Sequence, residues 1–166
     1  MAGVLSDRAG MTPEEHSREL REHGVPEELH AAFPGHGIGG LARAMGIRFT
    51  ELTPGRAVAT MPVEPSTQPG GILHGGAHCV LAETLASTAA GVHAGPDRYA
   101  VGVDINATHQ RGVASGTVTG TCTALHLGAT LTVHEVVMTD DRGRRLSTAR
   151  VTNLLRERPD AGRQGQ

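Results

Sequence analysis

Aromatic side chains are almost missing from this sequence. Phe33, Phe49 and Tyr99 are the complete set in 166 residues. A core must therefore be built from Val, Leu, Ile, Ala and Met, and a pocket must hold its ligand by aliphatic contacts more than by stacking. Lysine is absent, and the 15 basic residues, all arginine, leave a net charge of −2. Neither this charge balance nor the few aromatics support nucleic acid as a partner.

Cysteines and long apolar runs are also scarce. Cys79 and Cys122 are too few for a disulfide framework, and both lie in apolar segments, which predicts buried thiols in a reducing compartment. No apolar run approaches the ~20 residues of a membrane-spanning helix, and the first residues lack the apolar core of a secretory signal. We therefore expect a cytoplasmic protein with no membrane partner.

The chemistry is concentrated in residues 68–87. Gly75-Gly76 opens an Ala- and Leu-rich run that predicts a buried helix over residues 77–90, with Gly91 as its stop. Glu83 falls midway along this run with no opposite charge three or four residues away. A buried carboxylate is usually paired or functional. The alternative is a solvent-facing position on an amphipathic helix.

The start of this helix offers a complementary group. Its unpaired N–H groups and the helix dipole can stabilise an oxyanion such as the one that develops on an acyl carbonyl under attack. Gly75 and Glu83 are about 12 Å apart along one helix, yet both should lie about 3 Å from the same ester. A second subunit that donates the other half of the site is the simpler geometry.

The rest of the chain predicts an α+β domain in which one antiparallel sheet wraps around the central helix. Period-two patterns separated by turn residues predict strands at 47–52, 57–63, 100–108, 116–127, 130–139 and 146–155. Short helices are expected at 13–22, after a capping box at Thr12, and at 26–33. We expect residues 1–40 to form an N-terminal helical and loop extension, 41–156 the domain, and 157–166 a disordered tail.

A metal site is the main alternative for the chemistry. His74 and His78 are four residues apart, with Cys79 and Glu83 nearby, which would suit a metal-dependent hydrolase. However, His74 precedes the helix, and no HExxH or CxxC motif accompanies the pair. We therefore expect no metal. The glycine-rich run 35–40 has the spacing of a dinucleotide-binding loop but follows no strand, so a flexible loop is expected there.

The motifs together resemble a known family. Gln68 followed by Gly71-Ile-Leu-His-Gly-Gly, the downstream Glu83, and the order hairpin, central helix and four strands resemble the hotdog-fold acyl-CoA thioesterases. The sequence is most similar to the branch with a Glu on the central helix, which includes 1,4-dihydroxy-2-naphthoyl-CoA, 4-hydroxybenzoyl-CoA and enterobactin-proofreading thioesterases. The segments 101–111, 116–120, 125–128 and 141–144 carry the resemblance further.

The resemblance implies a function. It implies hydrolysis of an aromatic or related acyl-CoA to free acid and CoA, by a homodimeric active unit within a homotetramer. It implies no cofactor, because coenzyme A is part of the substrate. A hotdog module that binds acyl-CoA without cleaving it is the alternative from another class.

The same resemblance implies roles for residues. Glu83 would be the nucleophile or general base, and the Gly75 N–H would polarise the thioester carbonyl. Gln68 and His74 would position that carbonyl, and Ser87 would hold the carboxylate or the water. The residues implied to surround the acyl-CoA are Gly102, His109, Gln110, Arg111, Gly112, His126, Leu127, Gly128, Ala129, Thr130, Leu131 and Arg150. Arg111 and Arg150 would suit nucleotide phosphates. Close relatives often carry Arg or another polar residue where Ala129-Thr130 stands.

Overall fold

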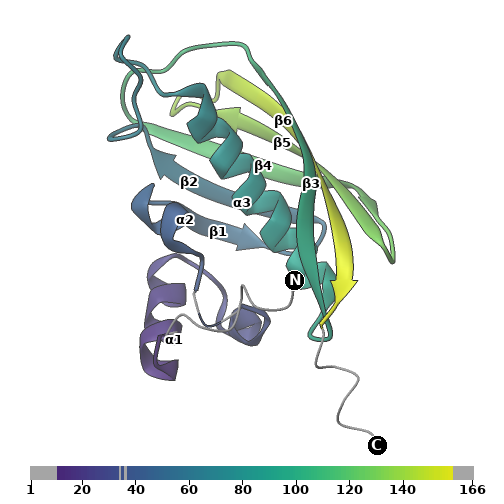
Figure 1. Ribbon diagram of the computed structural model, residues 1–166. Helices are drawn as coiled ribbons and strands as arrows, with labels where there is room; N and C mark the ends of the chain where they lie inside the picture. Colours follow the sequence, from purple (N-terminus) through teal and green to yellow (C-terminus); the bar gives the residue numbers. More distant parts are fainter. Residues whose placement is uncertain (1–10, 34, 36, 159–166) are drawn as a thin grey trace, which may run out of the picture.

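The computed structural model describes residues 11–158 apart from positions 34 and 36. A six-stranded antiparallel sheet with the order β1-β2-β4-β5-β6-β3 curves around one long helix, α3 (Gly75–Ala94). Figure 1 shows α3 lying along the concave face of the sheet. The predicted architecture, one antiparallel sheet wrapped around a central helix, is confirmed.

The six strands lie close to the ranges predicted from the alternating pattern. They are β1 (Arg48–Leu52), β2 (Arg56–Pro62), β3 (Arg98–His109), β4 (Thr117–Leu127), β5 (Leu131–Thr139) and β6 (Arg145–Glu157). The last strand reaches Glu157, the first residue of the expected tail. Residues 1–10 and 159–166, which include the rest of that tail, lie outside the described part of the chain.

The central helix is held by its own sequence and by the sheet. The Nδ1 atom of His74, the N-cap residue, accepts a hydrogen bond of 2.8 Å from the Gly76 N–H and so satisfies one of the free donors of the first turn. Leu81 and Leu85 on the inner face are fully buried against the sheet, and each such burial contributes about 1.5–3 kcal/mol.

The helix does not stop at Gly91, so that prediction is wrong. It continues to Ala94 and ends at Gly95, whose φ of 76° lies in the left-handed region. One glycine inside a helix costs only about 1 kcal/mol. Here the added turn buries Ala94 and lets His93 Nε2 lie 3.0 Å from the Gly128 carbonyl oxygen, which offsets that cost.

The N-terminal extension covers one edge of the sheet. Its described part contains α1 (Pro13–Glu22) and the 3₁₀ segment η1 (Glu27–Ala32), where an ordinary helix was expected, and it is followed by the short helix α2 (Gly40–Ala44). The capping box at Thr12 is confirmed. The Phe49 N–H at the outer edge of β1 donates to the His23 carbonyl oxygen at 2.8 Å. The edge strand β1 is therefore capped by the chain itself.

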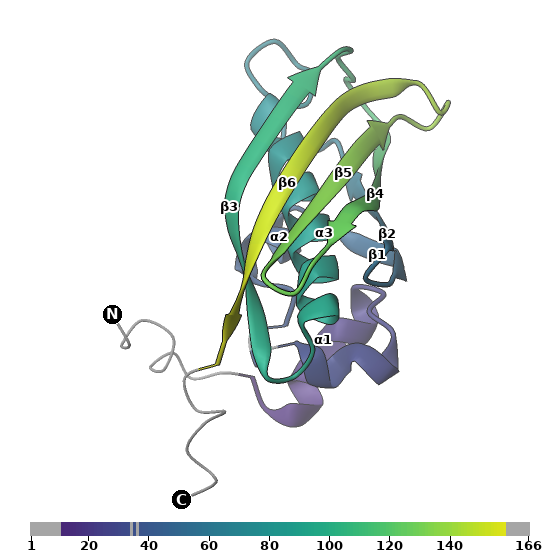
Figure 2. The same cartoon turned by 90° about the vertical axis from the view of Figure 1, so that its right-hand side faces the viewer.

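The opposite edge, formed by β3, pairs only with β6 (Figure 2). Three aliphatic side chains on it are exposed: Val101, Val103 and Ile105, with 50% of Val103 accessible to solvent. A long, apolar, unpaired edge is unusual in a protein that stays a monomer.

Among the described residues, no helix is long and apolar enough to cross a membrane.

Candidate active site

Glu83 lies on the side of α3 that the sheet leaves open, in a hollow of about 670 Å³ that we call the Glu83 hollow. Its walls come from the loop before α2, from α2 itself, from α3 and from β3. The lining residues are Ile38, Gly39, Gly40, Leu41, Ala42, Cys79, Val80, Glu83, Thr84, Gly102, Val103, Asp104 and Ile105. The wall is mainly aliphatic and has no aromatic side chain, as the composition predicts.

Glu83 is half-buried, so the prediction of a fully buried acid is wrong for a single chain. The sheet buries Leu81 and Leu85 completely, whereas the face of α3 that carries Glu83 lines the hollow and stays partly open. Cys79, on that same face, is likewise half-buried, whereas Cys122 is fully buried as predicted. Burial raises the pKa of the Cys122 thiol to about 12, which makes it inert.

Backbone from β3 lies against the Glu83 carboxylate. A Cβ atom added to Gly102 would overlap Glu83 Oε1 and lie 3.2 Å from its Cδ, so only glycine leaves room for the acid here. The pairing of β3 with β6 is irregular between Gly102 and Asp104, and the extra residue, Val103, bulges into the wall of the hollow. The structure therefore brings Gly102, which the resemblance implies lies around the acyl-CoA, against Glu83.

Ser87, one helical turn after Glu83, contacts the carboxylate directly. Its Oγ lies 2.8 Å from Glu83 Oε1 and also 2.8 Å from Asn153 Oδ1. Asn153 comes from β6, directly opposite Gly102 in the sheet, and is completely buried. The expected partnership of Ser87 with the acid is thus present in the structure, and Asn153 is a third member that sequence reasoning missed.

A second, smaller hollow of about 330 Å³ lies at the start of α3, and we call it the helix-start hollow. It brings Gln68 and Gly75 together with a run of residues implied to bind the acyl-CoA. Its lining is Gln68, Ile72, Leu73, Gly75, His78, His109, Gln110, Arg111 and Gly112. His74 is exposed beside it and is engaged as the helix cap, with its Nδ1 turned to Gly76.

The orientation of His109 in this hollow follows from its hydrogen bonds. The Ser147 hydroxyl donates to the Thr108 carbonyl oxygen at 3.1 Å, so its oxygen is free to accept from His109 Nδ1 at 2.9 Å. A neutral His109 then carries its lone pair on Nε2. That atom faces Gly75, since a Cβ added there would lie 2.9 Å from it.

His78 lies beneath His109 and is 3% exposed, with ring centroids 5.5 Å apart. Burial, helped by the neighbouring His109, lowers the pKa of His78 to about 4, so this ring is neutral at pH 7. Its Nδ1 has no hydrogen-bond partner among the described residues. No cluster of three or more His, Cys, Asp or Glu side chains suited to a metal ion is found within the described chain.

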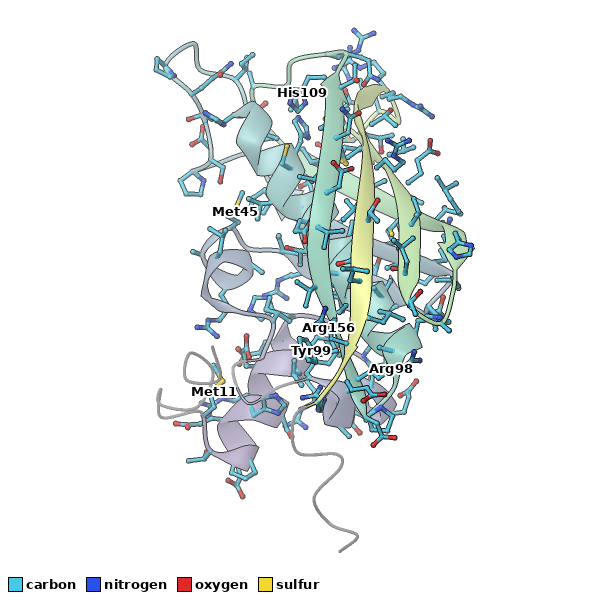
Figure 3. All side chains as sticks on the ribbon, turned by 45° about the vertical axis from the view of Figure 1, so that its right-hand side comes forward. Met11, Met45, Arg98, Tyr99, His109 and Arg156 are labelled. Atoms are coloured by element: carbon cyan, nitrogen blue, oxygen red, sulfur yellow. The ribbon has the colours of Figure 1, made fainter. Side chains whose placement is uncertain are left out.

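Other residues implied to bind the acyl-CoA lie far from both hollows within one chain. The turn between β4 and β5 lies beside the end of α3, where His93 Nε2 is 3.0 Å from the Gly128 carbonyl oxygen. The residues of this group are His126 and Leu127 at the end of β4, Gly128, Ala129 and Thr130 in the turn, and Leu131 at the start of β5. Arg98 at that end of α3 donates to the Ala129 carbonyl oxygen, whereas His109 lies at the other end of β3 (Figure 3). Arg150 is exposed on β6, between two inward-facing residues, and so points to the outer face of the sheet.

The N-terminal extension forms one wall of the Glu83 hollow, which the sequence did not indicate. Glu19 of α1 is almost fully buried, and its Oε1 accepts hydrogen bonds from the Ile38 N–H at 3.4 Å and from Arg43 at 3.3 Å. These bonds anchor the segment that carries Ile38 and Leu41 into the wall. Glu19 is one of several charged residues on α1, and nothing in the sequence distinguishes it from the others as an anchor.

Comparison with known proteins agrees with this geometry. The family described as Thioesterase superfamily matches residues 70–147, which include α3 and the strands β3 to β5. The proofreading thioesterase EntH of Cronobacter turicensis is 41% identical over 136 residues, which cover 81% of this chain and 96% of that protein. The chain belongs to the Thioesterase superfamily, and it is a thioester hydrolase with the hotdog fold.

Two solved structures illustrate the likeness. A thioesterase from Pseudomonas aeruginosa superposes with a TM-score of 0.69 at 37% identity, over 72% of this chain and 87% of that one. A thioesterase protein from Streptococcus pneumoniae, solved with coenzyme A, superposes with a TM-score of 0.61 over 68% of this chain and 87% of that one. The second is 19% identical, so it is similar in fold alone.

Proposed function

We propose that this thioester hydrolase acts on acyl-CoA thioesters with an aromatic acyl group, such as 1,4-dihydroxy-2-naphthoyl or hydroxybenzoyl, and that Glu83 is its reactive carboxylate. The observation that carries the mechanism is the position of Glu83 in a large aliphatic hollow, with a hydroxyl donor on Oε1 and room made by Gly102. The resemblance of the 68–87 motif supports the aromatic acyl group.

Glu83 can act in either of two ways. As a general base it takes a proton from a water whose oxygen attacks the carbonyl carbon, after which the carbon–sulfur bond breaks and the CoA thiolate takes up a proton. As a nucleophile its oxygen attacks the carbonyl carbon, the carbon–sulfur bond breaks, and the CoA thiolate leaves and takes up a proton; water then hydrolyses the mixed anhydride to the free acid and restores Glu83. In both routes the Gly75 N–H at the start of α3 donates to the oxygen on which negative charge develops.

A homodimer is the proposed active unit, because one chain separates the two halves of the site. Glu83 and Gly75 line different hollows and are eight residues, about 12 Å, apart along α3. The unpaired edge of β3 supplies a surface through which two copies can pair about a two-fold axis. The Gly75 end of one subunit would then complete the site around Glu83 of the other, and two such dimers would form the homotetramer.

The same pairing would bring separated CoA-binding residues to one ligand. The segment around Arg111 and the turn that carries Gly128 lie at opposite ends of β3 in one chain, and Arg150 lies on the outer face. We propose that Arg111 and Arg150 hold CoA phosphates, since guanidinium groups bind phosphate oxygens in a bidentate manner.

The test is thiol release from matched aromatic and straight-chain acyl-CoA substrates. We expect the aromatic thioesters to have the higher kcat/KM, and Glu83→Gln to lower kcat by about 10²–10⁴-fold. Glu22→Gln, at an exposed position at the end of α1, is the matched control and should leave kcat unchanged.

Each part of the proposal can fail separately. A preference for straight-chain thioesters would contradict the aromatic acyl group. A correctly folded Glu83→Gln protein with near wild-type turnover would contradict the role of Glu83. Binding of every thioester without thiol release would support the acyl-CoA-binding module instead.

A further inference from the structure

The hydrogen bonds around Ser87 cannot all be made as the atoms stand. Ser87 Oγ lies 2.8 Å from Glu83 Oε1 and 2.8 Å from Asn153 Oδ1, and both of these oxygens would have to accept a hydrogen bond from Ser87. A hydroxyl has one proton, so Ser87 can donate to only one of them. At the other end of the same amide, Asn153 Nδ2 is buried and has no hydrogen-bond partner among the residues that the structure describes.

Turning the Asn153 amide over resolves the conflict at Ser87. The oxygen and nitrogen of an amide have the same shape, so its orientation is decided by its hydrogen bonds. With the amide turned over, Nδ2 faces Ser87 and donates to Oγ, and the single Ser87 proton goes to Glu83. The hydrogen bonds then run in one direction, from the Asn153 amide to Ser87 and from Ser87 to Glu83, and the unpartnered end of the amide is an oxygen in place of a nitrogen.

We propose that Asn153 is a positioning residue: its amide nitrogen donates to Ser87, which directs the Ser87 proton onto Glu83 and fixes the carboxylate toward the hollow. The inference rests on the proposed role of Glu83. Asn153 does not line either hollow, and it acts through Ser87.

The place of Asn153 in the sheet explains why it can hold this position. It is 0% exposed and is paired with Gly102 on β3 on one side and with Thr132 on β5 on the other. Its contact with Ser87 holds the buried amide in place, because a side chain rotated away from Ser87 would lose this hydrogen bond without gaining water. Asn153 therefore anchors a mobile hydroxyl to the backbone of the sheet.

The experiment is a double-mutant cycle on turnover with an acyl-CoA that the wild type cleaves. We expect Asn153→Leu to lower kcat by about 10- to 100-fold, the effect of losing one hydrogen bond to a charged network, with KM nearly unchanged. In a Ser87→Ala background the same substitution should have no further effect, since its route to Glu83 is already cut. Multiplied effects in the double variant would overturn the proposal.

Two further variants sharpen the test. Asn153→Asp has the same shape and, at a pH where the new carboxyl is ionised, can only accept, so there it draws the Ser87 proton away from Glu83 and should lower kcat at least as much as Asn153→Leu. Wild-type turnover in a folded Asn153→Asp protein would overturn the donor assignment. If the leucine variant does not fold, Asn153→Ala removes the same amide and takes its place in the cycle.

Thr132→Val is the matched control. Thr132 is the equally buried neighbour of Asn153 across the sheet, and its hydroxyl has no partner within the described chain. Its replacement should leave kcat unchanged, whereas a loss equal to that of Asn153→Leu would mean that any change at this point of the sheet disturbs the site. The parallel measurement on Glu83→Gln separates the two ideas: wild-type turnover there refutes the proposed function, and additivity in the cycle refutes only the role of Asn153.

Discussion

Gly102→Ala adds one methyl group and tests the geometry around Glu83 directly. The new Cβ atom would overlap Glu83 Oε1, so this oxygen must retreat by about 1 Å to reach van der Waals distance. The retreat also disturbs the 2.8 Å contact with Ser87. Because the backbone of Gly102 does not have a positive φ, alanine fits the strand itself, and the perturbation falls on the carboxylate.

The expected magnitude follows from that displacement. A reacting group misplaced by about 1 Å loses on the order of 10²-fold in rate. We therefore expect kcat of Gly102→Ala to fall by about 10²-fold with little change in the temperature of unfolding.

The assay is steady-state thiol release together with thermal unfolding. Gly91→Ala is the control, because Gly91 is also near the open face of α3 but a Cβ atom there meets nothing within 4 Å. It should keep full turnover and gain about 0.5–1 kcal/mol of stability, as expected for Ala in place of Gly inside a helix. A Gly102→Ala enzyme with wild-type kcat would refute the claim that Glu83 reacts from the position seen here.

Three other predictions follow from the site. Mixing two inactive parents, Glu83→Ala and Gly75→Pro, should restore about a quarter of wild-type activity, since about half of the dimers are mixed and each has one intact site; heterodimers without activity would show that both groups act from one chain. Dialysis against a chelator should leave turnover unchanged, and a loss that zinc alone restores would favour the metal-dependent hydrolase. Burial lowers the pKa of His78 from 6.5 to about 4, so as the pH drops the unfolded chain binds a proton at this residue before the folded chain does. The free energy of unfolding should therefore fall between pH 6.5 and 4, by about 2 kcal/mol at about pH 5. Urea unfolding of His78→Ser should show a flatter dependence on pH, and an unchanged dependence would contradict this linkage.

The sequence predicted the architecture because its signals are local. Alternating Val and Thr residues with glycine or aspartate turns define each strand, and the Ala-rich run defines α3. The helix end was missed at Gly91 because tertiary packing outweighs the small cost of one glycine. Gln68, Gly75, Glu83 and Ser87 could be named as candidates from the sequence because they belong to one continuous motif that runs into α3.

The parts of the site that depend on register could not be predicted. Asn153 meets Ser87 only because β6 is aligned so that Asn153 is opposite Gly102, and one residue of slip would turn it to the outer face. A signal was present nonetheless: Asn153 interrupts the inward-facing series of Val151 and Leu155 on β6. The Glu19 anchor depends on how α1 packs, and no pattern in the chain encodes that.

The pairing of β3 with β6 has a consequence for how the chain folds as it is synthesised. Arg98 is paired with Glu157 and His109 with Ser147, so β3 finds no partner within the described chain until β6 has been made. At 5–20 residues per second, the segment between them takes roughly 2–10 s to appear, and such distant pairings also form slowly. During that delay neither edge of the strand β3, with its aliphatic side chains, is paired with another strand. Chains truncated before Arg145 should therefore aggregate and need chaperone protection, although they contain the complete 68–87 motif.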